Sequence, residues 1–338
     1  MSEEDRIIGS LLGGMCGDIL GAAVEGLSYA RIMYYFPNGM TEFQQNTRGF
    51  GKYTDDTEMV INLVRSLVRK GFCDAEDASR AFAENFDPNR GYGETAAKIL
   101  RDLQNGADYR TSGTKYFPEG SWANGGCMRI SPVAISYRNA GPAALHRAVT
   151  DALLCTHTHP SAIDAAYVQA TAIAWLTKSR VDSFDPDRFM YWLANICKTT
   201  EMREKIVVVR DVVAGTPGLS RTEPVTSWSD FFASDAWRSE RATCSRVSDD
   251  FQIRATDAVA SALVAFCFHW RSPRDAVVAA VHQGGDTDTV ATMVGSLVGA
   301  IHGHEWIPRS WWDNIEDRDH VIAFARRLPD VGSNNKNT

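Results

Sequence analysis

The chain has 338 residues, of which 44% are hydrophobic and 23% are charged, a composition typical of a globular protein with a sizeable core. Its formal net charge of −7 argues against nucleic-acid binding, because neutralising phosphates needs clustered lysine and arginine. The seven cysteines are scattered without a CxxC pair, which predicts reduced thiols rather than a zinc ribbon or a redox disulfide.

The chain starts with an acidic segment, MSEEDRIIGS, that lacks the basic region of a signal peptide. No uninterrupted apolar stretch reaches the ~18 residues of a membrane span. We therefore expect a cytoplasmic protein without a membrane segment, and we favour a monomer.

Glycine recurs at every fourth position in two segments, which places it on one face of a helix in each. The segments carry Gly13, Gly17 and Gly21 near the start of the chain and Gly295, Gly299 and Gly303 near its end. Because glycine costs ~1 kcal/mol at an interior helical position, its repeated use predicts close packing against another backbone. Each segment adjoins acidic residues. Glu25 ends the first one, where a carboxylate is unfavourable beside the helix dipole.

Helical periodicity dominates the rest of the chain. Apolar residues at helical spacing predict a helix over 59–68 that ends at Gly71. A second helix is expected after Pro160, where Ser161 and Asp164 have the spacing of a capping box. Further helices are predicted over 258–268, 273–282 and 290–301, and the short IVVV run at 206–209 lies in a helical context.

No segment shows a convincing strand pattern and no linker divides the chain, so the sequence predicts one all-α domain. We expect this domain to cover residues 1–330 and to be followed by a disordered tail at 331–338. The stretch 215–250 is rich in serine, threonine and tryptophan. We interpret it as an irregular functional or capping loop, in which Trp228 and Trp237 serve as lid contacts or as packing.

Two groups of acids and threonines stand immediately before predicted helices. Their members are Thr54, Asp55 and Asp56 in one group and Asp286, Asp288 and Thr289 in the other. Single acids at these positions would cap the helices, which explains one carboxylate but not two in each group. Four carboxylates in one place would need a cation, and oxygen ligands suit Mg²⁺ or Mn²⁺ rather than zinc. The spacing leaves open whether the two groups meet.

Two further segments carry weaker signals. In NGGCMR at 124–129, the pair of glycines can turn backbone N–H groups toward an anion such as a diphosphate. In THTHP at 156–160, two histidines without a third ligand are typical of a polar loop rather than a metal site.

Taken in order, these segments resemble the ADP-ribosylglycohydrolase family, which includes the dinitrogenase reductase-activating glycohydrolases. The matching pieces are GDILGAAVEG at 17–26, YTDDTEM at 53–59, NGGCMRISPVAI at 124–135, THTHP at 156–160, GGDTDTVATMVGSLVGAIHG at 284–303 and IPRSW at 307–311. The resemblance covers about residues 7 to 328. It implies a compact orthogonal helical bundle with a binuclear magnesium site in a central cleft.

The resemblance also implies roles for individual residues. The metal ligands would be Thr54, Asp55, Asp56, Asp286, Asp288 and Thr289. Glu25 matches the acid beside the scissile ribose and is our first choice to activate water, with Asp55 or Asp56 as the other candidate. Ligand contacts are expected from Ser121, Trp122, Asn124, Gly125, Gly126, Cys127, Met128 and His157, among which Trp122 would stack on adenine.

The implied reaction is magnesium-dependent hydrolysis of the bond between ADP-ribose and a protein side chain. Arginine is favoured as acceptor over serine because GAAVEG resembles the arginine-specific branch. One departure from the family is the stretch 251–255, which has no glycine where a glycine-rich loop is usual and puts recognition of the ribose and acceptor in doubt. Two alternatives stay open: a module that binds ADP-ribose without cleaving it, and a helical phosphohydrolase, which would release phosphate.

Overall fold

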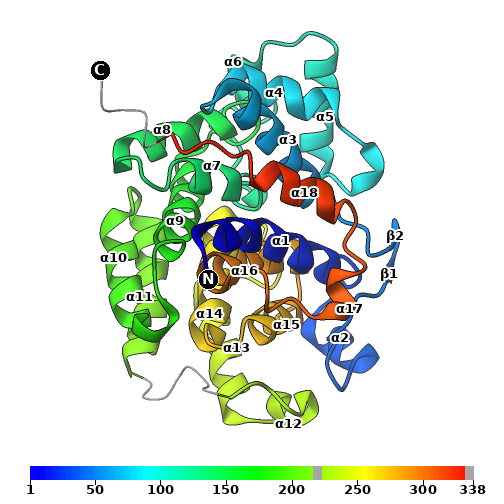
Figure 1. Ribbon diagram of the computed structural model, residues 1–338, viewed down its shortest axis with the longest axis vertical. Helices are drawn as coiled ribbons and strands as arrows, with labels where there is room; N and C mark the ends of the chain where they lie inside the picture. Colours follow the sequence, from blue (N-terminus) through cyan, green and yellow to red (C-terminus); the bar gives the residue numbers. More distant parts are fainter. Residues whose placement is uncertain (216–222, 332–338) are drawn as a thin grey trace.

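Helix α1 (Glu3–Gly21) and helix α16 (Thr287–His302) lie side by side at the centre of the fold (Figure 1). The structure is a computed structural model that describes residues 1–215 and 223–331. The two helices touch through their glycines: a Cβ on Gly295 would stand 1.9 Å from the Gly13 carbonyl oxygen, and one on Gly17 would stand 2.0 Å from the Ala291 carbonyl oxygen. The predicted close packing is confirmed. The pairing runs antiparallel, so the end of α1 lies beside the start of α16.

Gly295→Ala is expected to lower the free energy of unfolding by about 2–3 kcal/mol, because the added methyl group overpacks the contact with α1. Helix propensity alone predicts the opposite sign, a gain of ~1 kcal/mol, so urea unfolding separates the two effects. Gly141→Ala is the control, since a Cβ there meets nothing within 4 Å. A stabilised Gly295→Ala protein would show that the contact is not tight.

The other helices surround this pair. Helices α3 to α6 gather at one end of the long axis of the molecule, and α12 lies at the other (Figure 1). The elements up to residue 153 are α2 (Tyr29–Tyr35), β1 (Gln45–Asn46), β2 (Gly49–Phe50), α3 (Asp55–Lys70), α4 (Ala75–Glu84), η1 (Pro88–Arg90), α5 (Glu94–Gln104), α6 (Tyr109–Lys115), η2 (Asn124–Gly126), α7 (Ser131–Ser136) and α8 (Pro142–Leu153). The later ones are α9 (Pro160–Leu176), η3 (Val181–Ser183), α10 (Pro186–Ile196), α11 (Thr200–Gly215), α12 (Trp228–Phe232), α13 (Asp235–Val247), α14 (Ala255–His269), α15 (Pro273–His282), α17 (Arg309–Trp312) and α18 (Arg318–Ala325).

The predicted all-α class is confirmed, because the described residues contain eighteen α-helices and only one two-stranded antiparallel pair, β1 with β2. Helix α3 begins after Thr54, whose hydroxyl accepts from the Asp56 amide. It ends at Gly71, whose φ of 77° gives the left-handed cap that the sequence predicted. The predicted helices over 258–268, 273–282 and 290–301 are likewise present, and the 206–209 run lies within α11.

The interpretation of 215–250 as an irregular loop is wrong for the part that the structure describes. Residues 216–222 lie outside that part, but α12 and α13 account for most of 223–250. The serines that indicated a loop are helix caps, because Ser227 accepts from the Asp230 amide and Ser234 from the Trp237 amide. Trp228 and Trp237 are buried side chains, and the Trp237 indole donates to the Tyr29 hydroxyl at 3.1 Å. Both tryptophans therefore serve packing.

The predicted capping box at the start of α9 is also wrong. The helix begins at Pro160, with His159 as its cap, and the His159 ring accepts from the Ser161 amide. Proline at the first helical position favours this earlier start. Asp164 lies inside the helix and accepts from the Lys198 and Thr199 amides, so its carboxylate anchors the start of α11 instead.

Other expectations concern thiols, membranes and the chain end. All seven cysteines are buried free thiols, as predicted. Among the described helices, none combines the length and the hydropathy that a membrane crossing requires. The predicted tail at 331–338 lies outside the described residues except for Val331, whose amide donates to the Ser136 carbonyl. The boundary of the domain at residue 330 stays a prediction.

Candidate functional site

The two acid groups meet because the starts of α3 and α16 both contact α1. The buried carboxylate of Asp18, in α1, accepts from the Thr54 amide at 3.0 Å and from the Thr57 amide at 3.0 Å. One turn later, the Gly21 carbonyl accepts from the Thr287 hydroxyl at 2.9 Å. Across the resulting junction, Thr289 Oγ1 lies 3.4 Å from Asp56 Oδ2. Helix α1 thus brings together two segments that are more than 200 residues apart.

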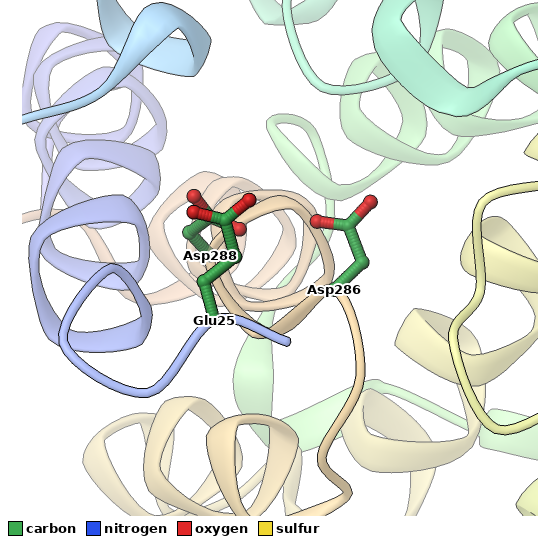
Figure 2. A group of neighbouring side chains, drawn as sticks. All are labelled: Glu25, Asp286 and Asp288. Carbon is green, nitrogen blue, oxygen red and sulfur yellow. The ribbon is translucent and has the colours of Figure 1, made fainter. Parts of the chain in front are cut away.

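Glu25 reaches the same place through backbone bonds that tie the segment after α1 to the diglycine turn, Gly284 and Gly285, which precedes α16. The Gly26 amide donates to the Gly285 carbonyl at 2.8 Å, and the Gly285 amide donates to the Leu27 carbonyl at 2.9 Å. Gly285 has φ of 81°, which favours glycine there. Figure 2 shows the result: the carboxylates of Glu25 and Asp288 stand beside that of Asp286, with ligand oxygens within 4.8 Å of one another.

Burial and mutual repulsion oppose the ionisation of the carboxyl groups in this cluster. Burial raises the pKa of Asp55, Asp56 and Asp288 well above the usual value for a carboxyl, and the neighbouring carboxylates raise these pKa values further. Burial likewise raises the pKa of Asp286, and burial together with the charge of Asp286 raises that of Glu25.

The donor set fits a hard cation. Asp56 Oδ1 is buried and has no hydrogen-bond partner, so one carboxylate oxygen at the centre of the cluster lacks compensation. The ligand atoms nearby are carboxylate and hydroxyl oxygens, the types that Mg²⁺, Ca²⁺ and Mn²⁺ prefer. A bound divalent cation would supply the positive charge that these raised pKa values indicate.

The acids form one wall of a cavity of about 370 Å³. From the predicted site, its lining includes Glu25, Asp55, Asp56, Ser121, Trp122, Asn124, Gly125, Met128, His157, Asp286, Asp288 and Thr289. Three predicted residues lie behind this wall: Thr54 caps α3 beside Asp56, while Gly126 and Cys127 are buried at the end of η2. Their predicted roles in binding a metal or ligand stay untested.

The NGG segment (Asn124, Gly125 and Gly126) and His157 pack against each other in the cavity wall. A Cβ on Gly125 would stand 2.8 Å from His157 Cε1, so glycine lets the imidazole ring lie against the backbone. Burial, aided by the charge of Arg129, lowers the pKa of His157 to about 3. The ring is therefore neutral at physiological pH, and it can donate a hydrogen bond to a ligand or accept one from it without adding charge. His159 lies outside the lining and caps α9, as the choice of His157 required.

Comparison with known proteins decides the family of this chain. A sequence model of the ADP-ribosylglycohydrolase family matches residues 1–338, the whole chain. The chain belongs to the ADP-ribosylglycohydrolase family. It is similar to ADP-ribosylhydrolase ARH3 of Gallus gallus, with 26% identity over 96% of this chain and 93% of the relative. It is also similar to the ADP-ribosyl dinitrogen reductase glycohydrolase of Rhodospirillum rubrum, with 26% identity over 93% of this chain and 92% of the relative.

The fold of the family is seen in a solved structure as well. An ADP-ribosylglycohydrolase-related protein complex superposes with a TM-score of 0.64 at 23% identity, over 98% of this chain and 99% of that chain. The resemblance drawn from the motifs is thus confirmed. As a family member, this protein is a glycohydrolase, and the predicted assignment to the hydrolases holds.

Two residues that position the site of this glycohydrolase were not predicted. Asp18 is one, and its signal in the sequence is an acid in the apolar last part of the first helix. Arg129 is the other, a fully buried arginine that donates to the Gly125 carbonyl at 2.7 Å and to the Thr156 hydroxyl at 2.6 Å. It joins the NGG segment to the THTHP segment. An arginine directly after an apolar methionine was the available signal.

The departure from the family at 251–255 lies at the rim of the cavity. Ile253 lines the cavity, and the Ile253 carbonyl accepts from the Asn124 amide at 2.9 Å. The Arg254 guanidinium lies 4.9 Å from the centre of the Trp122 ring, and Trp122 is 41% exposed. The glycine-free stretch therefore supports both the NGG segment and the aromatic residue predicted to stack on adenine.

Proposed function

We propose that this glycohydrolase uses two Mg²⁺ ions to hydrolyse the bond between ADP-ribose and a protein side chain. The observation that carries the proposal is the convergence of five carboxylates on the cavity beside the NGG segment. The chemical groups of ADP-ribose match these features. Its diphosphate can accept from the backbone N–H groups of a glycine turn, its adenine can stack on an aromatic side chain at the rim, and its ribose hydroxyls can bind metal ions. A cytoplasmic location and a monomeric state remain predictions.

The acidic cluster would hold the ions through Thr54, Asp55, Asp56, Asp286, Asp288 and Thr289. Mn²⁺ would substitute for Mg²⁺, because both take oxygen ligands. When bound, the ions supply Lewis acidity at the distal ribose and its leaving bond. The protein holds the metal ligands in position. Asp18 fixes the start of α3, and the contacts with α1 fix the start of α16.

In this proposal Glu25 is the general base that activates the attacking water. Its carboxylate accepts one proton from a water molecule as the water oxygen bonds to C1″ of the distal ribose. The C1″–acceptor bond breaks, and its electron pair leaves with the acceptor atom, which takes up a proton from solvent while Glu25 returns its own proton to solvent. The sugar carries positive charge at this stage, as in other glycoside cleavages, and the carboxylates around it stabilise that charge.

We favour arginine as the acceptor, as the GAAVEG segment suggested, with serine next. Glu25 is exposed at the edge of the cluster, where its carboxylate would attract a guanidinium. A second observation favours serine. The positive charge of Arg48 partly offsets the rise in the pKa of Glu25 that burial and Asp286 cause, and this charge would repel an arginine acceptor more than a neutral one.

Arginine-linked and serine-linked ADP-ribosylated peptides, incubated separately with the protein and Mg²⁺, test the proposal. Mass spectrometry is expected to show intact ADP-ribose released from the arginine-linked peptide and no release in EDTA. Faster release from the serine-linked peptide would reverse the order of acceptors. Binding of ADP-ribose without release from either peptide would indicate the binding module, and release of phosphate would indicate the phosphohydrolase.

A further inference from the structure

Gln252 has an unusual backbone for its residue type. It lies in the turn before α14, and its φ is 52°, in the left-handed region that side chains other than glycine disfavour. In the described part of the chain, Asp317 is the one other non-glycine residue with positive φ. Gln252 is also nearly inaccessible, with 4% of its surface exposed. The contacts around Gln252 therefore hold its backbone in this disfavoured conformation.

Both halves of the Gln252 amide are used. Its Oε1 accepts from the Asp286 amide at 3.1 Å, and its Nε2 donates to the Asp249 carbonyl at 3.2 Å. Because a backbone N–H can only donate and a carbonyl can only accept, these two partners fix the orientation of the side chain. The Gln252 carbonyl accepts from Asn124 Nδ2 at 2.9 Å.

These bonds join the start of α16 to the NGG segment. Asn124 Nδ2 also donates to Asp286 Oδ2 at 2.6 Å, so Gln252, Asn124 and Asp286 form a closed set of contacts. The approach of Gln252 depends on the diglycine turn, since a Cβ on Gly285 would stand 2.2 Å from Gln252 Oε1. Figure 2 shows one carboxylate oxygen of Asp286 directed toward Glu25 and Asp288.

We propose that Gln252 is a positioning residue, which aims Asp286 into the metal cluster and holds the Asn124 segment against it. The inference rests on the proposed function, in which Asp286 binds a metal ion. Partners that orient a metal ligand through hydrogen bonds contribute to metal affinity without touching the ion. A glycine at this position would adopt the same φ freely, but it would leave the Asp286 amide with only its second acceptor, the Phe251 carbonyl at 3.2 Å.

Two variants test the role of Gln252. Gln252→Gly keeps the left-handed turn and removes the amide. Gln252→Asn keeps an amide and tolerates positive φ but is too short to reach Asp286. Calorimetric titration with Mn²⁺ alone is expected to show metal affinity lower by about 10-fold or more for both variants. The melting temperature of the metal-free Gly variant is expected to stay near that of the wild type, because strain is relieved as contacts are lost.

A buried glutamine outside the cavity serves as the matched control. Gln169 is 1% exposed and donates to the Met293 carbonyl. Gln169→Ala is expected to lower the melting temperature and to leave Mn²⁺ affinity unchanged, the reverse of the pattern at position 252. Unchanged Mn²⁺ affinity in both Gln252 variants would overturn the proposal.

A crystal structure of Gln252→Gly gives a decision that does not depend on metal. Displacement of Asp286 is expected, while Asn124 keeps its bond to the backbone carbonyl of residue 252. An unchanged position of Asp286 would refute a positioning role. If the wild-type protein bound no Mn²⁺, the metal site of the proposed function would fail, while this structure would still decide the role of Gln252.

Discussion

Glu25→Gln is expected to lower kcat by about 10³-fold and to leave the affinity for ADP-ribose nearly unchanged. Glutamine has the size of glutamate but cannot accept a proton from the attacking water. Binding is retained because the surfaces expected to hold the diphosphate and adenine, around Asn124 and Trp122, belong to other parts of the cavity. Single-turnover release of ADP-ribose measures the rate, and calorimetry measures affinity.

Glu305→Gln is the control for this substitution, because Glu305 is exposed and follows the far end of α16. Its rate should match that of the wild type. A fully active Glu25→Gln enzyme would remove Glu25 from the mechanism, and Asp55 and Asp56 would then be the next candidates for proton transfer. Loss of ADP-ribose binding together with activity would instead assign Glu25 to substrate binding.

Asp288→Asn is expected to change stability in opposite directions with and without Mg²⁺. In the metal-free protein, burial and neighbouring carboxylates raise the pKa of Asp288, so its negative charge is unfavourable and the amide raises the melting temperature. In the wild type, each Mg²⁺ at about 100 times its dissociation constant adds ~2.7 kcal/mol of stability. The variant loses much of this gain and its activity. Thermal unfolding with Mg²⁺ or EDTA measures both effects.

Asp77→Asn provides the contrast. Asp77 is also buried, but hydrogen bonds from Arg69 and Ser66 outweigh burial and lower its pKa, so its charge stabilises the fold. Its replacement is expected to lower the melting temperature equally with Mg²⁺ and with EDTA. If Asp288→Asn behaved like Asp77→Asn, the cluster would be held by internal hydrogen bonds rather than by metal ions.

Local signals predicted much of the helical structure. The apolar spacing over 59–68 and the cap at Gly71 were sufficient for α3, because one buried face and a left-handed glycine are properties of the segment itself. The same holds for α15, whose predicted bounds, Pro273–His282, are those observed. Where local signals conflicted, the prediction was wrong. The serines that indicated a loop are the caps of α12 and α13, and burial of the tryptophans stabilises these helices.

The candidate site shows the same division. Its acids were predicted because two carboxylates beside threonines at one helix start exceed what capping needs. Asp18 was missed, because its role is to accept hydrogen bonds from two amides at the start of α3, 36 and 39 residues later, and periodicity carries no such information. Gln252 was read only as the absence of glycine. Its left-handed backbone and its bond to Asp286 depend on the position of the diglycine turn.

By itself, the sequence determined the helical class, the family and the residue types of a hard-cation site, because these follow from spacing and from ordered motifs. Only the tertiary structure decided that the two acid groups form one site. Their meeting requires α1 to contact α16 at the distance that glycine allows, and at the same time to hold the start of α3 through Asp18. Such a contact depends on three segments at once, so no single segment encodes it.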